Sequence, residues 1–190
     1  MSKDTKNTIL DAAERMIQER GFHDVSFRAI ASAVGIKSAS VHYHFPSKSD
    51  LGVALANRYR EQMLDFLGPM DGGGKLSGLE RLERFSGAFV PVLERGHMCL
   101  CGVLGAETGG LPEPVEEAAA DFFKACIIWL TGAFEDGLAD QSLQFSGSPE
   151  NQAVTYISLL EGAMLLSLSL KDHSHLARVR DSYLALLTQK

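Results

Sequence analysis

Residues 25–51 read VSFRAIASAVGIKSASVHYHFPSKSDL, and their spacing decides the fold of the first part of the chain. Two short apolar stretches lie on either side of Gly35, where the chain must reverse and a residue without a Cβ adopts a positive φ at little cost. Ala31 is small where the second helix crosses the first, and Ser26 is placed as an N-cap. The stretch therefore predicts a helix-turn-helix, which indicates DNA binding.

The second short helix ends in a run of aromatic and basic side chains. Residues 42–45 read His-Tyr-His-Phe, and Pro46, Ser47 and Lys48 follow. Over residues 5–60 the chain resembles the DNA-binding half of TetR-family transcriptional regulators. The run departs from the family at its first position, because a histidine stands where the family usually has another aromatic residue, most often tyrosine.

The resemblance implies a role for each matching residue of the helix-turn-helix. Ser26 and Arg28 are expected to help clamp the DNA backbone, and Tyr43 and Lys48 to touch phosphates. Residues 37–40 are expected to face base edges. The expected DNA-binding residues are Ser26, Arg28, Lys37, Ser38, Ala39, Ser40, His42, Tyr43 and Lys48.

The charge of the chain is unevenly distributed along the sequence. The 190 residues are 45% hydrophobic and 22% charged, which is typical of an ordinary globular protein. A formal net charge of -6 argues at first against nucleic acid. However, residues 1–60 hold nine Lys and Arg against six Asp and Glu, whereas residues 61–190 hold nine against 18. The acidic excess lies outside the helix-turn-helix, so a locally basic face is possible.

Targeting signals are absent from the pattern of the sequence. The first seven residues, Met-Ser-Lys-Asp-Thr-Lys-Asn, contain no apolar region of an export signal. Three cysteines in such a chain do not indicate a disulfide scaffold. The most apolar stretch, residues 153–170, has Glu161 near its centre, which disfavours a membrane span. We therefore expect a cytoplasmic protein with no membrane segment.

The remaining pattern is helical, and we expect an all-α protein of about nine helices. A first helix stops at Gly21 and completes a three-helix DNA-binding domain in residues 1–46. Residues 47–190 are expected to form a linking helix and a C-terminal domain that binds an effector and dimerises. The linking helix starts at Ser47 and stops at Gly68, before a glycine-rich loop.

Five more helices are expected after the glycine-rich loop at residues 71–75. The first contains Pro91, whose ring would bend the helix by its clash with the carbonyl of Gly87. The fourth starts at Ser148 and Pro149, an N-cap followed by a first-turn proline. The expected helices cover residues 77–95, 100–108, a long span after Pro114, 149–170 and a final span from about 174.

The helix expected over residues 149–170 and the long helix before it have more apolar surface than one small bundle would bury. The former also carries small residues that permit close helix contact, namely Ser158, Gly162, Ala163 and Ser167. A second copy of the chain is the simplest cover, and the resemblance implies the same, since the family dimerises through two late helices of each subunit. The alternative is that these faces pack inside the monomer.

Residues 95–107 contain two of the three cysteines of the chain, Cys99 and Cys101. Gly96 ends one helix and the next begins soon after, which places Cys99 and Cys101 near a helix N-terminus that favours thiolate. Some family members that sense electrophiles or oxidants resemble this stretch, and there the matching residue is Cys99. The alternative is that the cysteines are small core residues. A metal site that includes His97 is not expected, because the spacing does not match zinc sites.

Aromatic and apolar side chains at helical spacing are candidates for an effector pocket, although the same pattern is typical of a plain core. Glu107 is either a buried acid facing that pocket or a solvated charge at a helix end. The expected pocket or sensor residues are Phe89, Cys99, Cys101, Glu107, Phe122, Trp129 and Met164. We expect no cofactor, no metal and no catalytic constellation.

These patterns predict a homodimeric transcriptional repressor and not an enzyme. It would bind double-stranded operator DNA and be released by a small apolar or electrophilic effector that shifts the population of its states. One alternative is a thiol redox or metal-binding protein that uses Cys99 and Cys101, and another is a DNA-binding scaffold with no effector.

Overall fold

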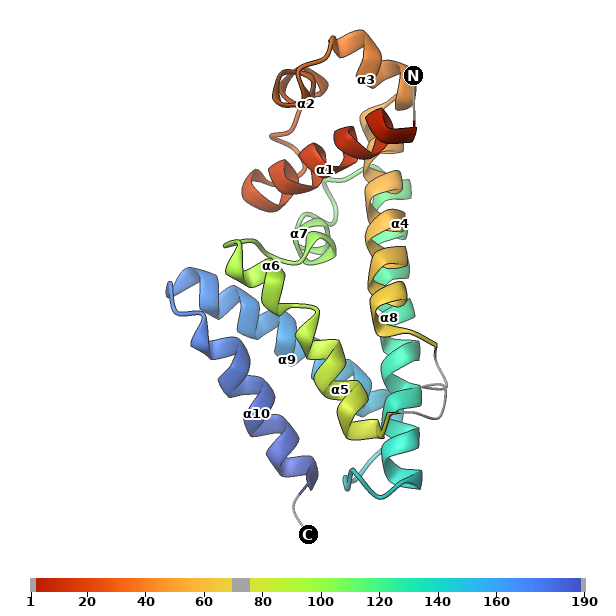
Figure 1. The fold of residues 1–190 in the computed structure, drawn as a ribbon, viewed down its shortest axis with the longest axis vertical. Helices are drawn as coiled ribbons and strands as arrows, with labels where there is room; N and C mark the ends of the chain where they lie inside the picture. Colours follow the sequence, from red (N-terminus) through yellow and green to blue (C-terminus); the bar gives the residue numbers. More distant parts are fainter. Residues whose placement is uncertain (1–2, 70–75, 189–190) are drawn as a thin grey trace. The chain divides into compact units, whose positions relative to one another are not determined.

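The computed structural model describes residues 3–69 and 76–188, which form helices and short connections with no strand among them (Figure 1). Within this part of the chain, the expected all-α fold is confirmed. Contacts divide the protein into two compact units: a head unit, up to Arg60 together with Cys99–Phe122, and a C-terminal unit, Glu61–Met98 together with Phe123 onward. The glycine-rich loop expected at residues 71–75 lies outside the described residues.

The helix-turn-helix is present where the sequence predicts it. Gly21 and Gly35 both have positive φ, 83° and 75°, and each stands directly after the end of a helix. The hydroxyl of Ser26 accepts a hydrogen bond from Ala29 N at 3.2 Å and so caps the second helix. The three helices are α1 (Lys3–Arg20), α2 (Phe27–Val34) and α3 (Ser38–His44).

Apolar side chains hold α1, α2 and α3 together. Ile30 on α2 and Val41 on α3 are fully buried at 0% exposure, and Phe45 directly after α3 is 2% exposed. Each such side chain stabilises the fold by roughly 1.5–3 kcal/mol. Since Val41 faces inward, the opposite face of the short α3 helix is left at the surface.

The fourth helix, α4 (Lys48–Leu67), starts with a reciprocal cap at Ser47, as expected. Asp50 N donates to the Ser47 hydroxyl at 3.1 Å, and Ser47 N donates to the Asp50 carboxylate at 2.9 Å. Further along α4, Arg58 donates to Asp11 at 2.6 Å and to Glu14 at 2.7 Å, both on α1. These bonds tie α4 to α1 within the head unit.

The prediction of a single bent helix over residues 77–95 is wrong. The chain forms two helices, α5 (Gly78–Gly87) and α6 (Val90–Glu94), separated by Ala88 and Phe89. Pro91 is the second residue of α6, where its missing N–H leaves no helical bond unmade. Starting a new helix avoids the clash that an interior proline would cause, and the described residues therefore contain ten helices instead of about nine.

The later helices follow the predicted order. The hydroxyl of Ser148 accepts from Asn151 N at 3.2 Å and Pro149 stands in the first turn, so the predicted start of α9 (Pro149–Ser169) is confirmed. In the C-terminal unit, α9 packs against both α6 and α10 (Ser174–Thr188). The remaining helices are α7 (Leu100–Ala106) and α8 (Glu113–Ala139).

Aromatic rings form the centre of the C-terminal unit. Trp129 is 1% exposed and stacks with Phe85 at a centroid distance of 6.1 Å. The guanidinium of buried Arg81 lies 4.5 Å from the Trp129 ring and forms an ion pair with Asp136. The indole N–H donates to the carbonyl of Gly68 at 3.1 Å. The face and the polar edge of Trp129 are thus both occupied by the protein itself.

In the head unit, three segments meet at Gly52 of α4. A Cβ at this position would lie 2.8 Å from a ring carbon of Phe22, in the α1–α2 loop, and 2.8 Å from a methyl of Val115, at the start of α8. Atoms cannot approach a Cβ this closely without moving, so α4 requires a glycine here.

We predict that Gly52→Ala lowers the free energy of unfolding by about 1–3 kcal/mol, because the added methyl overpacks this meeting point. Gly87→Ala is the matched control, since a Cβ at that helical position meets no atom within 4 Å. Urea unfolding followed by circular dichroism measures both variants. Equal effects of the two substitutions would contradict the close packing at Gly52.

Candidate nucleic-acid interface

The outward face of α3 carries the side chains that we expect to contact DNA. Ala39, His42 and Tyr43 are exposed, and so is Lys37 at the N-cap. Tyr43 is 73% exposed, which is unusual for a large aromatic side chain, and its ring packs only edge-to-face on neighbouring His44. Because Val41 anchors the same helix from its other side, this face projects as a fixed surface.

The start of α2 adds two further expected contacts. Ser26 and Arg28 are both exposed, the first as the N-cap and the second in the first turn. The Ser26 oxygen accepts from Ala29 N at 3.2 Å, while a serine hydroxyl can still donate its own hydrogen to a phosphate oxygen. Unpaired backbone N–H groups at a helix start also favour an anion.

His42 packs on the neighbouring helix. Its ring lies edge-to-face against Phe27, the first residue of α2, at a centroid distance of 4.7 Å. This contact positions the imidazole that replaces the usual aromatic residue of the family. The sequence did not single out Phe27, because its place in the first turn of α2 carries no chemical signal.

Lys48 is held by the α1–α2 loop. Its ammonium donates to the carbonyl of His23 at 3.0 Å and lies 4.7 Å from the centre of the Phe22 ring. Burial lowers the pKa of Lys48 from its usual value, while the charges of Glu107 and Asp24 oppose this shift. The lysine expected to touch a phosphate is therefore already positioned in the chain without DNA.

The residues expected in an effector pocket are divided between the two units. Phe89, Trp129 and Met164 are buried in the C-terminal unit. Phe122 belongs to the head unit, where its ring lies 5.3 Å from that of Tyr59. The burial of all four agrees with a core role, and their contact with an effector remains a prediction.

The three cysteines are buried and form no disulfide with one another. Cys99 is the N-cap of α7 and is 1% exposed, and Cys101 follows within the helix at 0%. On α8, burial and the nearby charge of Glu161 raise the pKa of the Cys126 thiol to about 12. Cys126 therefore stays a thiol at neutral pH. Across residues 3–69 and 76–188, no three His, Cys, Asp or Glu side chains gather as metal ligands.

Glu107 lies against the head loop. One carboxylate oxygen accepts a hydrogen bond from the backbone N–H of Phe22 at 2.8 Å, and the other lies 3.7 Å from His23 Nε2. The sequence offered a pocket acid or a solvated helix end for this residue. A contact across 85 positions of sequence has no local signal, so sequence reasoning missed it.

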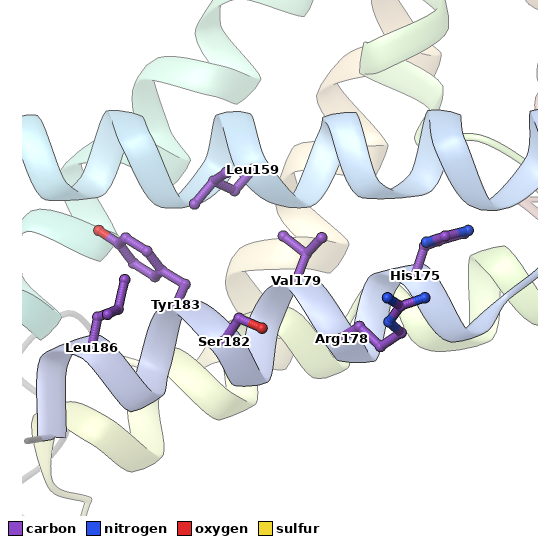
Figure 2. A pocket seen from close by; sticks show the side chains of 7 residues that line it. All are labelled: Leu159, His175, Arg178, Val179, Ser182, Tyr183 and Leu186. Atoms are coloured by element: carbon purple, nitrogen blue, oxygen red, sulfur yellow. The ribbon is translucent and has the colours of Figure 1, made fainter.

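A groove of about 360 Å³ lies between α9 and α10 in the C-terminal unit, and Figure 2 shows the side chains that line it. It was not among the expected sites. Val179 and Tyr183 of α10 line this groove, whereas Leu184 of the same helix is buried. The lining residues are Leu159, His175, Arg178, Val179, Ser182, Tyr183 and Leu186.

Comparisons with known proteins agree with this geometry. The model of the bacterial regulatory proteins of the tetR family matches residues 9–55, and that of the tetracyclin repressor-like C-terminal domain matches residues 78–183. A TetR regulator from Legionella pneumophila is 34% identical, with a TM-score of 0.87 over 98% of this chain and 97% of that one. A TetR-family regulator from Agrobacterium tumefaciens is 28% identical, with a TM-score of 0.92 over 98% and 99%.

The curated relatives include the HTH-type transcriptional regulator LmrA of Bacillus subtilis, 26% identical over 93% of both chains. The packed helix-turn-helix with its exposed α3 face defines a DNA-binding protein of the helix-turn-helix class. The family matches cover more than half of the sequence, and the chain belongs to the TetR family of bacterial transcriptional regulators. In the described helices we find no segment with the length and hydropathy of a membrane span.

We predict that Tyr43→Phe and Lys48→Ala weaken binding to specific and random DNA alike, because phosphate contacts position a protein without reading bases. Lys48→Ala should also lower the slope of log affinity against log salt by about one. Fluorescence anisotropy over a salt series measures both, with Lys124→Ala on α8 as the control. A changed base preference with intact random-DNA affinity would contradict the assignment.

We expect a different result for the residues that face base edges. Substitutions at Lys37, Ser38 or Ser40 should change which duplex sequence is preferred, because each correct base contact contributes about 1–3 kcal/mol of discrimination. Selection from a random-sequence library with each variant measures the preference. If every such variant selects the same sequence as the unmodified protein, α3 does not read bases through these residues.

Proposed function

We propose that this regulator is a cytoplasmic repressor that binds operator DNA as a homodimer and leaves it when a small apolar or electrophilic effector binds. The observation that carries the proposal is the outward face of α3. Tyr43 is 73% exposed on a helix that is anchored by fully buried Val41. A fixed, exposed face on the second helix of a helix-turn-helix is suited to the major groove.

An apolar surface on the last two helices supports the homodimer. On α9, its C-cap residue and α10, five large apolar side chains are between 43% and 67% exposed. Exposed large apolar side chains gathered on two neighbouring helices usually mark a protein contact surface, and a second copy of the same helices is the occupant we propose. These side chains are Val154, Leu165, Leu166, Leu170 and Leu186.

Gly162 on α9 supports the same surface. It is exposed, and a Cβ at this position would meet no atom of its own chain within 4 Å. The close helix approach expected at this glycine is therefore not made inside the chain. A helix of a partner subunit is the remaining candidate for it.

Release from DNA is proposed as a population shift between two spacings of the paired DNA-binding heads. An effector changes DNA affinity only by the difference in its own affinity for the two states. Helix α4 carries residues of both units, since the head unit ends at Arg60 and the C-terminal unit begins at Glu61. We propose α4 as the element that passes the effector's preference to the head.

The proposed function is tested by selecting duplexes from a random-sequence library with the purified protein. We expect a near-palindrome whose half-sites lie about 34–36 Å apart, one turn of B-DNA. Sedimentation of the complex should show two or more chains on each selected duplex. Failure to enrich any sequence, or one chain bound to one asymmetric site, would refute the proposal.

We predict that Gly162→Leu weakens the homodimer and operator binding together, because overpacking a close contact costs about 1–3 kcal/mol. The isolated chain should fold normally, since the site is open within it. Sedimentation velocity and circular dichroism measure the two properties. Glu94→Leu, at an exposed position of α6, is the control for an added apolar side chain. A dimer unaffected by Gly162→Leu would place the interface elsewhere.

We predict that Cys99 reacts with a small electrophile faster than Cys126. Burial raises the pKa of Cys126 to about 12, whereas Cys99 lies at a helix start, which favours thiolate. Since Cys99 is 1% exposed, its reaction requires local opening of the head unit. Mass spectrometry after brief alkylation identifies the modified residue. Release from DNA should follow the modification. The same release should occur in Cys126→Ser and be lost in Cys99→Ser. If Cys99→Ser responds normally, Cys99 is only a core residue.

A further inference from the structure

Two neighbouring residues of the α1–α2 loop, Phe22 and His23, form hydrogen bonds with side chains from two other parts of the head unit. The backbone N–H of Phe22 donates to the carboxylate of Glu107 at 2.8 Å, directly after α7. The backbone carbonyl of the next residue, His23, accepts from the ammonium of Lys48 on α4 at 3.0 Å. The backbone of one short loop thus forms hydrogen bonds both with Glu107, from the second half of the sequence, and with Lys48, which is expected to touch DNA.

The Glu107 contact is built into the packing of the loop. Gly21 has a φ of 83°, and a Cβ there would collide with the Glu107 carboxylate, so the loop approaches α7 through a glycine. Phe22 itself is 2% exposed and lies against Gly52 of α4. The position of the loop is therefore fixed by two contacts: the burial of Phe22 against α4 and the close approach of Gly21 to the Glu107 carboxylate.

The chemistry of this contact favours a strong and directional link. A carboxylate that accepts from a backbone N–H forms a charge-assisted hydrogen bond, which is stronger than a bond between neutral groups. Lys48 and His23 place positive or titratable nitrogens beside Glu107, and Asp24 is the other charged group near Lys48. Without the carboxylate, the Phe22 N–H loses its acceptor at a largely buried position.

We propose that Glu107 is a positioning residue for operator binding: it fixes the α1–α2 loop, and with it the orientation of the helix-turn-helix, to α7. The proposal rests on the proposed function and extends it. Glu107 touches no DNA, and it acts through Phe22. Helix α1 also packs against α7, and the Glu107 carboxylate adds a directional hydrogen bond beside that packing.

The proposal separates two kinds of DNA binding. A palindromic operator needs two heads at a fixed spacing, so a loosened head pays an entropy cost on binding both half-sites. Random DNA is bound through phosphates wherever a head lands, and it makes no demand on spacing. Loss of the Glu107 link should therefore weaken the first kind of binding selectively.

The test compares Glu107→Ala, Glu107→Gln and a control in the full-length protein. Glutamine keeps an oxygen that can accept from Phe22 N, whereas alanine does not. The control is Glu116→Ala, which removes a carboxylate that accepts from Gly109 N at 2.6 Å without touching the head loop. Affinity is measured for the duplex selected by the unmodified protein and for a random duplex of equal length. Amide hydrogen exchange at Phe22 is followed by NMR.

We expect Glu107→Ala to weaken binding of the selected duplex about tenfold, with random-duplex affinity nearly unchanged and the melting temperature lowered by only a few degrees. Phe22 exchange should accelerate about tenfold in this variant, and Glu107→Gln and Glu116→Ala should resemble the unmodified protein. Unchanged selected-duplex affinity, or an equal loss on both duplexes, would overturn the proposal. If the unmodified protein selects no duplex, the proposed function fails, and unchanged Phe22 exchange in Glu107→Ala would then overturn the positioning role.

Discussion

The head unit depends on the burial of one side chain, Phe22, in the loop between α1 and α2. Its ring is 2% exposed and lies against Gly52, beside the ammonium of Lys48. Its backbone N–H is bonded to Glu107. A loop between two helices is ordinarily a variable surface connection. Here the aromatic ring and the hydrogen bond join the DNA-binding helices to α4 and α7, so the orientation of the helix-turn-helix follows from how Phe22 is held.

This arrangement explains how one small domain can be both rigid and adjustable. The contacts between α2 and α3 are apolar and fully buried around Ile30 and Val41, so the reading surface behaves as one body. The contacts that orient this body are the buried ring of Phe22 and a few hydrogen bonds, and hydrogen bonds can be exchanged for bonds to water. In the proposed release, an effector changes the balance of only a few hydrogen bonds, within the coupling energies that binding can supply.

Local features of the fold were predictable because their causes are local. The caps at Ser26, Ser47 and Ser148 and the turn at Gly35 each follow from residue types within four positions. Pro91 shows the limit of this reasoning. Its presence correctly predicted an interruption of the helix, but the interruption is the start of a new helix and not a bend. The residues expected to face DNA were predicted from family resemblance, and the structure presents Lys37, Ala39, His42 and Tyr43 at the surface. The bond from Glu107 and the groove between α9 and α10 depend on tertiary packing, which no spacing encodes.

The central claim is that two such heads, each oriented by its own α1–α2 loop, grip one DNA duplex together. A hydroxyl-radical footprint on the duplex that the protein selects tests this most directly, because it maps the protected sugars on both strands. The account predicts two protected patches on one face of the duplex, centred about 34–36 Å apart and related by a two-fold axis. A single patch, or continuous protection without symmetry, would contradict it.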